Sequence, residues 1–187
     1  MRWQSVVLAG IAIAVVAIAG WQVWEAKQLK IPKWLESDRP DCQVWDPYPQ
    51  RNETASWSGD CVAGKAEGQG TLTWRYSDPA GNPLTETYSG GLSAGKFNGH
   101  GTEIMPSGYR FDGMYRDGEE NGHGVAVWSD ARYDGEWKDG KPNGFGTFTT
   151  SDGKQHTGEW IQGCLDDAGA IVWIDNDDET CKKLLAK

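Results

Sequence analysis

The chain has 187 residues, with 18 lysines and arginines against 27 aspartates and glutamates, and a formal net charge of −9 at pH 7. This length suits one domain and a tether. The acidic balance excludes the broad basic surface that nucleic acid requires and argues against general attraction to anionic lipid, so we expect no nucleic-acid partner.

The N-terminal segment is strongly apolar. Val6 to Gly20 is an unbroken apolar run, and tryptophans flank it within residues 3–24. About 20 such residues cross a bilayer core of about 30 Å, and tryptophans are enriched at both membrane interfaces. We therefore predict that residues 1–30 form a transmembrane α-helix or signal anchor that contacts the lipid bilayer through residues 3–24. A cleaved signal peptide is the alternative, because Ala17-Ile18-Ala19 resembles a cleavage site.

The predicted helix has a face of small residues. Gly10, Ala14 and Ala17 are spaced at i, i+4 and i+7, which would allow a helix of an integral membrane protein to approach closely. Alanine is abundant here, so chance placement also accounts for the pattern.

The four cysteines indicate the compartment. All lie beyond the apolar segment and form an even set, which is typical of an oxidising compartment. The lysines that follow the apolar segment slightly favour a cytoplasmic C-terminal part, because positive charge is enriched on the cytoplasmic side of membrane helices. We expect a single-pass membrane protein whose C-terminal part is extracytoplasmic, in the periplasm if the source is bacterial. Four unpaired cytosolic thiols are the alternative.

Residues 31–54 contain Pro32, Pro40, Pro47 and Pro49. Proline interrupts regular elements, so we predict an irregular, proline-rich lead-in that lies on the following domain or spaces it from the membrane.

Residues 55–165 contain a repeated motif: an aromatic residue, any residue and glycine, then glycine five residues later, then Gly-x-Gly. The first glycines of successive copies, which lie 31, 23, 22 and 23 residues apart, are Gly59, Gly90, Gly113, Gly135 and, in a partial fifth copy, Gly158. Alternating residues between glycine-containing turns are typical of β-hairpins. A fixed period of this size indicates a repeat array in which each unit packs on its neighbours.

Two columns of side chains should form the hydrophobic spine of the sheet. The first contains Trp57, Tyr88, Phe111, Tyr133 and His156, and the second contains Cys61, Leu92, Tyr115, Trp137 and Trp160. Glycines inside the strands should let backbone or an aromatic ring approach closely. The second sheet face must stay polar or meet a partner, and the side chains that fit a polar face are Arg110, Asp112, Arg132 and Asp134.

The stretch from Tyr133 to Gly146 resembles the MORN (membrane occupation and recognition nexus) repeat, Y-x-G-x-W/F-x-x-G-x-x-x-G-x-G. Four full copies and one partial copy carry the resemblance. It implies an all-β repeat array, an elongated twisted antiparallel sheet of β-hairpins, that sometimes forms a homodimer. It also implies scaffolding or membrane-associated recognition without activity of its own. The first and last copies depart from the pattern, as capping repeats do.

Residues 166–187 are expected to cap the array. Ala168 to Ile174 is predicted to be a final strand covering the open sheet edge, and Thr180 is the predicted N-cap of a short helix. Strand spacing puts about 35–40 Å between Cys61 and Cys164, too far for a disulfide. The predicted pairs are Cys42–Cys61 and Cys164–Cys181.

The sequence offers no catalytic set, no cofactor motif and no metal site that we would assign. His100 and His123 occupy equivalent positions in adjacent copies, but no third metal ligand accompanies them. The Gly-x-Gly pairs lack the strand–loop–helix context of a phosphate-binding loop. We therefore expect a protein that is not an enzyme.

Our first interpretation is a membrane-anchored extracytoplasmic scaffold, an accessory subunit or assembly factor of a membrane protein complex. The alternative is a cleaved, soluble periplasmic or secreted module that binds a peptide or glycan by stacking on its aromatic columns. Besides the small-residue face of the helix, the proposed partner-binding residues are Trp57, Tyr88, Tyr115, Tyr133, Trp137 and Trp160.

Overall fold

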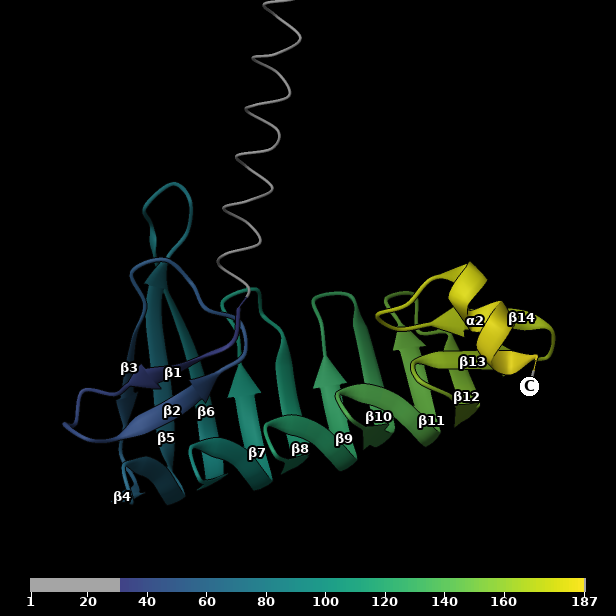
Figure 1. The fold of residues 1–187 in the computed structure, drawn as a ribbon. Coiled ribbons are helices and arrows are strands. Elements are labelled where there is room, and N and C mark those ends of the chain that lie inside the picture. The colour runs from purple at the N-terminus through teal and green to yellow at the C-terminus, as the bar shows by residue number, and fades with distance from the viewer. Residues whose placement is uncertain (1–30, 187) are drawn as a thin grey trace, which may run out of the picture.

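The computed structural model describes residues 31–186, and most of them form one long twisted sheet (Figure 1). The order of the twelve-stranded sheet is β1-β2-β5-β6-β7-β8-β9-β10-β11-β12, with β3 and β4 both paired to β5. Its strands are β1 (Lys33–Glu36), β2 (Gln43–Asp46), β3 (Thr54–Trp57), β4 (Asp60–Val62), β5 (Lys65–Ser77), β6 (Pro83–Ser93), β7 (Lys96–Ile104), β8 (Arg110–Arg116), β9 (Glu119–Val127), β10 (Ala131–Lys138), β11 (Lys141–Thr150) and β12 (Gln155–Trp160). The all-β array of hairpins predicted from the sequence is confirmed.

One hairpin turn in each copy has the same two-residue form. Both residues of each turn have positive φ, and the second is always glycine. This geometry is that of the type I′ turn, whose twist matches the twist of the strands. The five turns are Ala63-Gly64, Ala94-Gly95, Asp117-Gly118, Asp139-Gly140 and Gln162-Gly163.

A second set of glycines forms a continuous row across the sheet. In β5 to β12 each strand contributes one glycine opposite the next: Gly70, Gly90, Gly101, Gly113, Gly124, Gly135, Gly146 and Gly158. Aromatic rings lie on this row, and a Cβ on Gly101 would be 2.4 Å from the Tyr88 ring. The expectation that strand glycines admit a ring is therefore confirmed.

The core is a spine of aromatic side chains in edge-to-face contact. Ring centroids are 5.4 Å apart for Tyr88 and Tyr115, 5.2 Å for Phe111 and Trp137, and 5.3 Å for Tyr133 and Trp160. Such pairs are favoured by the ring quadrupole. Just past the glycine row the strand register shifts in β6, β8 and β10. Each bulge increases the local bend, and the strands curl at their turn ends (Figure 1).

The lead-in is more regular than its prolines suggest. β1 and β2 form an antiparallel hairpin, and Gln43 of β2 pairs in parallel with Lys65 of β5. Trp34 and Trp45 contact edge to face at 5.2 Å, and the Lys65 ammonium lies 3.2 Å from the Trp34 ring centre. Aromatic and cation–π contacts therefore order a segment that we expected to be irregular.

The C-terminal cap also differs from the expectation. β14 (Ala170–Trp173) does not extend the main sheet but pairs with β13 (Cys164–Asp167) in a separate two-stranded sheet, against which α2 (Asp178–Leu185) packs. Leu165 of β13 takes the place of the repeated ring, 2.8 Å from a Cβ built on Gly158. The helix N-cap is Asp177, whose side chain accepts the Thr180 N–H, so the prediction of Thr180 was wrong.

The predicted transmembrane helix, with Gly10, Ala14 and Ala17, lies outside the described residues. Within residues 31–186, no helix has both the length and the apolar character that crossing a bilayer would need.

Candidate interaction surface

Two disulfides hold the two ends of the array. Cys42–Cys61 joins the lead-in to the first repeat, with Cα atoms 5.6 Å apart, and Cys164–Cys181 joins β13 to α2, with Cα atoms 5.4 Å apart. Both predicted pairings are confirmed. Each bond forms within one half of the cysteine set because the length of the array separates the two halves.

The aromatic residues proposed to contact a partner are core residues. Their exposed fractions are 2% for Trp57, 0% for Tyr88, 3% for Tyr115, 0% for Tyr133, 4% for Trp137 and 1% for Trp160. The polar atoms of these rings bond internally: Trp137 Nε1 donates to the Gly124 carbonyl at 3.2 Å, and Trp160 Nε1 donates to the Gly146 carbonyl at 3.2 Å. The curled turns bury both columns, so they present no stacking surface.

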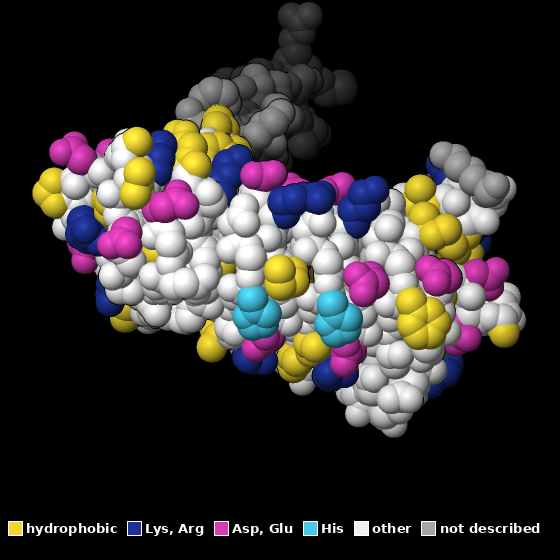
Figure 2. All heavy atoms as spheres, turned by 90° about the horizontal axis from the view of Figure 1, so that it is seen from below, with side chains coloured by type: hydrophobic (Ala, Val, Ile, Leu, Met, Phe, Trp, Pro, Cys, Tyr) yellow, Lys and Arg dark blue, Asp and Glu magenta, His cyan; other side chains and the backbone are white. Residues whose placement is uncertain are grey.

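The outer face of the sheet is polar, as expected. His100 Nε2 lies 3.1 Å from Asp112 Oδ1, and Arg110 pairs with the other oxygen of the same carboxylate. The next repeat places His123, Arg132 and Asp134 in the same arrangement, and Figure 2 shows the histidines beside acidic side chains. Exposed ion pairs of this kind contribute little to stability.

Apolar side chains interrupt this polar face singly. Met114 is 40% and Phe145 is 59% exposed. Cross-strand pairs place Met114 opposite His100 and Phe145 opposite Glu159. The outer face is therefore mixed, without the contiguous apolar patch that marks a hydrophobic interface.

The opposite side carries a row of stacked turns. From the second turn onward, the glycine N–H donates to a carbonyl of the preceding repeat: Gly95 to Ala66 at 2.8 Å, Gly118 to Phe97 at 3.0 Å, Gly140 to Glu120 at 3.1 Å and Gly163 to Pro142 at 2.7 Å. These bonds fix the positions of successive turns relative to one another. We call the five turns, residues 63–64, 94–95, 117–118, 139–140 and 162–163, the turn row.

Acidic side chains gather beside the middle of the turn row. Burial, with Glu86 and Glu120 nearby, raises the pKa of Glu103 to about 8. Burial, with Glu119 and Asp175 nearby, also raises the pKa of Glu120. In residues 31–186 no Lys or Arg forms an ion pair with these glutamates. Burial therefore favours the neutral form of Glu103 and Glu120, and the neighbouring carboxyls are close enough to repel one another when charged.

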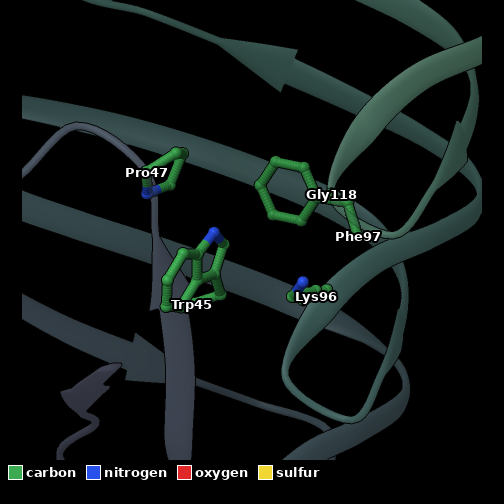
Figure 3. A pocket seen from close by; sticks show the side chains of 5 residues that line it. All are labelled: Trp45, Pro47, Lys96, Phe97 and Gly118. Atoms are coloured by element: carbon green, nitrogen blue, oxygen red, sulfur yellow. The ribbon is translucent and has the colours of Figure 1, made fainter. Parts of the chain in front are cut away.

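A small recess lies where the lead-in ends on the turn row. Trp45, Pro47, Lys96, Phe97 and Gly118 line it (Figure 3). The Lys96 ammonium lies 5.3 Å from the Trp45 ring centre. Sequence reasoning missed this side of the array entirely. The sequence does contain a signal for this side: lysine follows the turn glycine in most copies, but Glu119 stands at this position after Gly118.

Fold and surface together define a non-globular class of protein, a β-hairpin repeat array with specialised ends. The MORN repeat family model matches residues 57–75, 88–108, 111–130 and 133–155, and the chain therefore contains four MORN repeats. This family is generally non-enzymatic. No curated protein matches the chain.

Between residues 31 and 186, no three His, Cys, Asp or Glu side chains come together in a way that could hold a metal ion. The histidines of the outer face each meet one carboxylate, as described above. The third, His156, is buried, and its Nδ1 lies 2.6 Å from Asp167 Oδ2, which ties β12 to β13.

Proposed function

We propose that the protein is a non-catalytic scaffold whose central repeats hold a protein partner. One observation carries this proposal: disulfide-bonded segments cover both ends of the array, while the middle of the turn row stays uncovered. Repeat arrays expose long continuous surfaces of this kind, and repeat proteins use them for binding. The presence of MORN repeats agrees with an interaction role.

We further propose that the scaffold is extracytoplasmic and membrane-anchored, and that it is an accessory subunit or assembly factor of a membrane protein complex. Two disulfides support an oxidising compartment. The apolar sequence of residues 3–24 supports the anchor, and its small-residue face supports contact with an integral membrane protein.

A soluble module that stacks a peptide or glycan on its aromatic columns is the weaker candidate. The columns are buried, so this function would require the core to open. Loss of such a core would cost several of the strongest contacts in the molecule.

The test uses the full-length protein at its native level, purified in mild detergent after cross-linking in cells. The expected result is a membrane protein partner at constant ratio and retention of the full chain in carbonate-washed membranes. Recovery as a lone monomer, or release into the soluble fraction after N-terminal cleavage, would contradict the proposal.

Compartment is measured separately, by thiol labelling with a membrane-impermeant reagent. We expect labelling of the four cysteines only after a reductant is added, in cells whose inner membrane is intact. If the thiols react without reductant, or only after the inner membrane is broken, then the extracytoplasmic assignment is wrong.

A further inference from the structure

The turn row has a second set of hydrogen-bonding groups, the glycine carbonyls. At the start of the row the Gly64 carbonyl accepts the Gln43 N–H at 3.0 Å, and the Gly95 carbonyl accepts the Trp45 N–H at 2.8 Å. At the end of the row the Gly163 carbonyl accepts the Ile174 N–H at 2.9 Å. Extended segments of the chain itself therefore lie across both ends.

The middle of the row has no such cover. Within residues 31–186 no backbone or side-chain donor bonds the carbonyl of Gly118 or that of Gly140. Both glycines share the positive φ of the other turn glycines and the backward N–H bond of Gly95 and Gly163, so their carbonyls occupy equivalent positions. Two acceptors in series are open between two stretches of covered row.

The lead-in stops at this point for a chemical reason. Gln43 and Trp45 donate at a spacing of two residues, the period of an extended strand. The next donor in this register would be residue 47, which is a proline and has no N–H. Figure 3 shows Pro47 across the recess from Gly118. The chain then leaves the row, and β2 ends towards the middle of the sheet in Figure 1.

The side chains beside the turn row indicate the chemistry of a segment that would continue the line of the lead-in. At the first two turns the residue after the turn glycine meets the lead-in: Lys65 lies on Trp34 and bonds Gln43 Oε1 at 2.6 Å, and Lys96 lies near Trp45. At the third turn this position is Glu119, followed by Glu120. The position after the turn glycine is therefore acidic at the third turn, where intrachain cover ends, and is lysine again at Lys141 after the fourth. Glu120 Oε2 lies 3.6 Å from a Cβ built on Gly140, so a carboxylate stands between the two open turns.

We propose that the carbonyls of Gly118 and Gly140 dock an extended segment of a partner protein, which continues the line of β2 and places a lysine or arginine against Glu119 and Glu120. The segment donates N–H groups two residues apart, as in strand addition to a sheet edge. This proposal rests on the proposed scaffold function and specifies where on the array the partner lies. Continuity with β2 sets the direction in which the docked segment runs, and the carboxylates of Glu119 and Glu120 favour a positively charged side chain on it.

The probe is a library of random linear twelve-residue peptides displayed on phage and selected on the full-length protein in detergent. We expect enriched peptides to carry a basic residue among residues of alternating polarity. One enriched peptide is then synthesised with a single N-methyl group at each position in turn. Methylation should weaken binding at alternate positions only, because an extended segment turns every second N–H towards the carbonyls.

Two protein variants of equal charge change locate the site. Glu119→Lys should weaken binding of the synthetic peptide by about tenfold or more, because it opposes the basic residue. Glu159→Lys on the outer face is the matched control and should leave affinity unchanged. Both side chains are exposed, so thermal unfolding midpoints should match that of the original protein, which excludes misfolding as the cause.

A third variant tests the role of the proline. Pro47→Ala supplies the missing N–H, so the lead-in should extend to the Gly118 carbonyl and compete with the peptide. The readouts are weaker peptide binding and slow amide exchange at residue 47. Failure to enrich peptides, N-methyl effects without alternation, or equal losses in the two glutamate variants would overturn the docking line. The scaffold proposal fails separately, if no partner co-purifies from cells.

Discussion

At the scale of single residues, the array depends on positions where a side chain must be absent. Gly101 has extended backbone geometry that any residue adopts, yet the Tyr88 ring occupies the place of its Cβ. Glycine is therefore required at the strand positions for packing, whereas at the turns it is required for the backbone conformation. The same ring-over-glycine contact recurs for Phe111 on Gly124 and Tyr133 on Gly146.

Gly101→Ala should destabilise the protein by about 2–3 kcal/mol, the usual cost of overpacking a core. The reason is that the new Cβ would lie 2.4 Å from the Tyr88 ring. Denaturant unfolding measures the loss. In a Tyr88→Ala background the same glycine substitution should cost at least about 1 kcal/mol less, since contacting residues are not additive. Equal costs in both backgrounds would show that the ring is not the obstacle.

Glu103 is the residue for which pH dependence is expected. Its exposed fraction is 8%, and burial first, then Glu86 and Glu120, raise its pKa from 4.5 to about 8. Between these values the folded state binds more protons than the unfolded state, so stability falls as pH rises from about 4.5 to about 8. Below about pH 4.5 Glu103 is protonated in both the folded and the unfolded state, so it no longer makes the free energy of unfolding depend on pH.

Glu103→Gln should therefore flatten the decline in unfolding free energy between pH 5 and pH 8.5 and should stabilise the protein at the upper pH. Asp46, whose pKa burial and Glu53 raise to about 7, will keep part of the slope. Exposed Glu159→Gln is the control. If Glu103→Gln leaves the original slope intact, the buried carboxyl is not its source.

At the scale of elements, the two ends of the array are specialised in different ways. The lead-in covers the first turns through β2 and its two tryptophans, whereas the last repeat loses its ring at His156. There, Leu165 covers Gly158 and the His156–Asp167 pair links β12 to β13. One disulfide holds each end in place. The two disulfides close loops of similar length, with sequence separations of 19 and 17 residues, so each end is a local unit.

Replacing Cys164 and Cys181 together by serine should cost about 3 kcal/mol, the loop-entropy value for the separation of 17 residues. Denaturation under non-reducing conditions measures the cost. Limited proteolysis should then cut near α2 while the lead-in stays intact. The Cys42→Ser, Cys61→Ser protein is the matched control, with cleavage expected in the lead-in instead. Cleavage at the same end in both proteins would contradict independent ends.

Elements with a strict period were predictable from the sequence, and elements defined by tertiary contacts were not. Turn glycines, strand alternation and cysteine positions carry local signals, so the hairpins and both disulfides could be derived. The strands of the lead-in depend on Trp34 and Lys65, which are far apart in sequence. The burial of Tyr88 and Trp137 depends on the bend at the bulges, which no local pattern states.

The candidate docking line could not be derived for the same reason. It consists of backbone carbonyls, which every residue possesses, and only the placement of β2 shows which ones are already bonded. The sequence contained one clue, the change from Lys96 to Glu119 after the turn glycine. That clue gains meaning only when the turns are seen as one row.

At the scale of the whole molecule, the repeats are interchangeable units between fixed ends. Arg110 precedes one unit as Arg132 precedes the next, and the two make equivalent ion pairs with Asp112 and Asp134. A chain of nearest-neighbour contacts tolerates changes in the number of units.

Deletion of residues 111–132, which joins Arg110 to Tyr133, should leave a shorter protein that still folds with both disulfides formed. Unfolding should stay cooperative, with a smaller denaturant slope because less surface is buried. Circular dichroism and thiol counting provide the readouts. Deletion of residues 111–125 breaks the period and is the control, which should not fold. Scrambled disulfides in the in-phase deletion would contradict interchangeable units.

The backward hydrogen bonds of the turn glycines from Gly95 onward also give the array a fixed increment. Every unit adds one turn at one set distance, so the separation between the lead-in and the C-terminal helix can change only in whole steps. Related chains with more or fewer units would act as molecular rulers of graded length. Each added step would bring one further open carbonyl and lengthen the segment that a partner must supply.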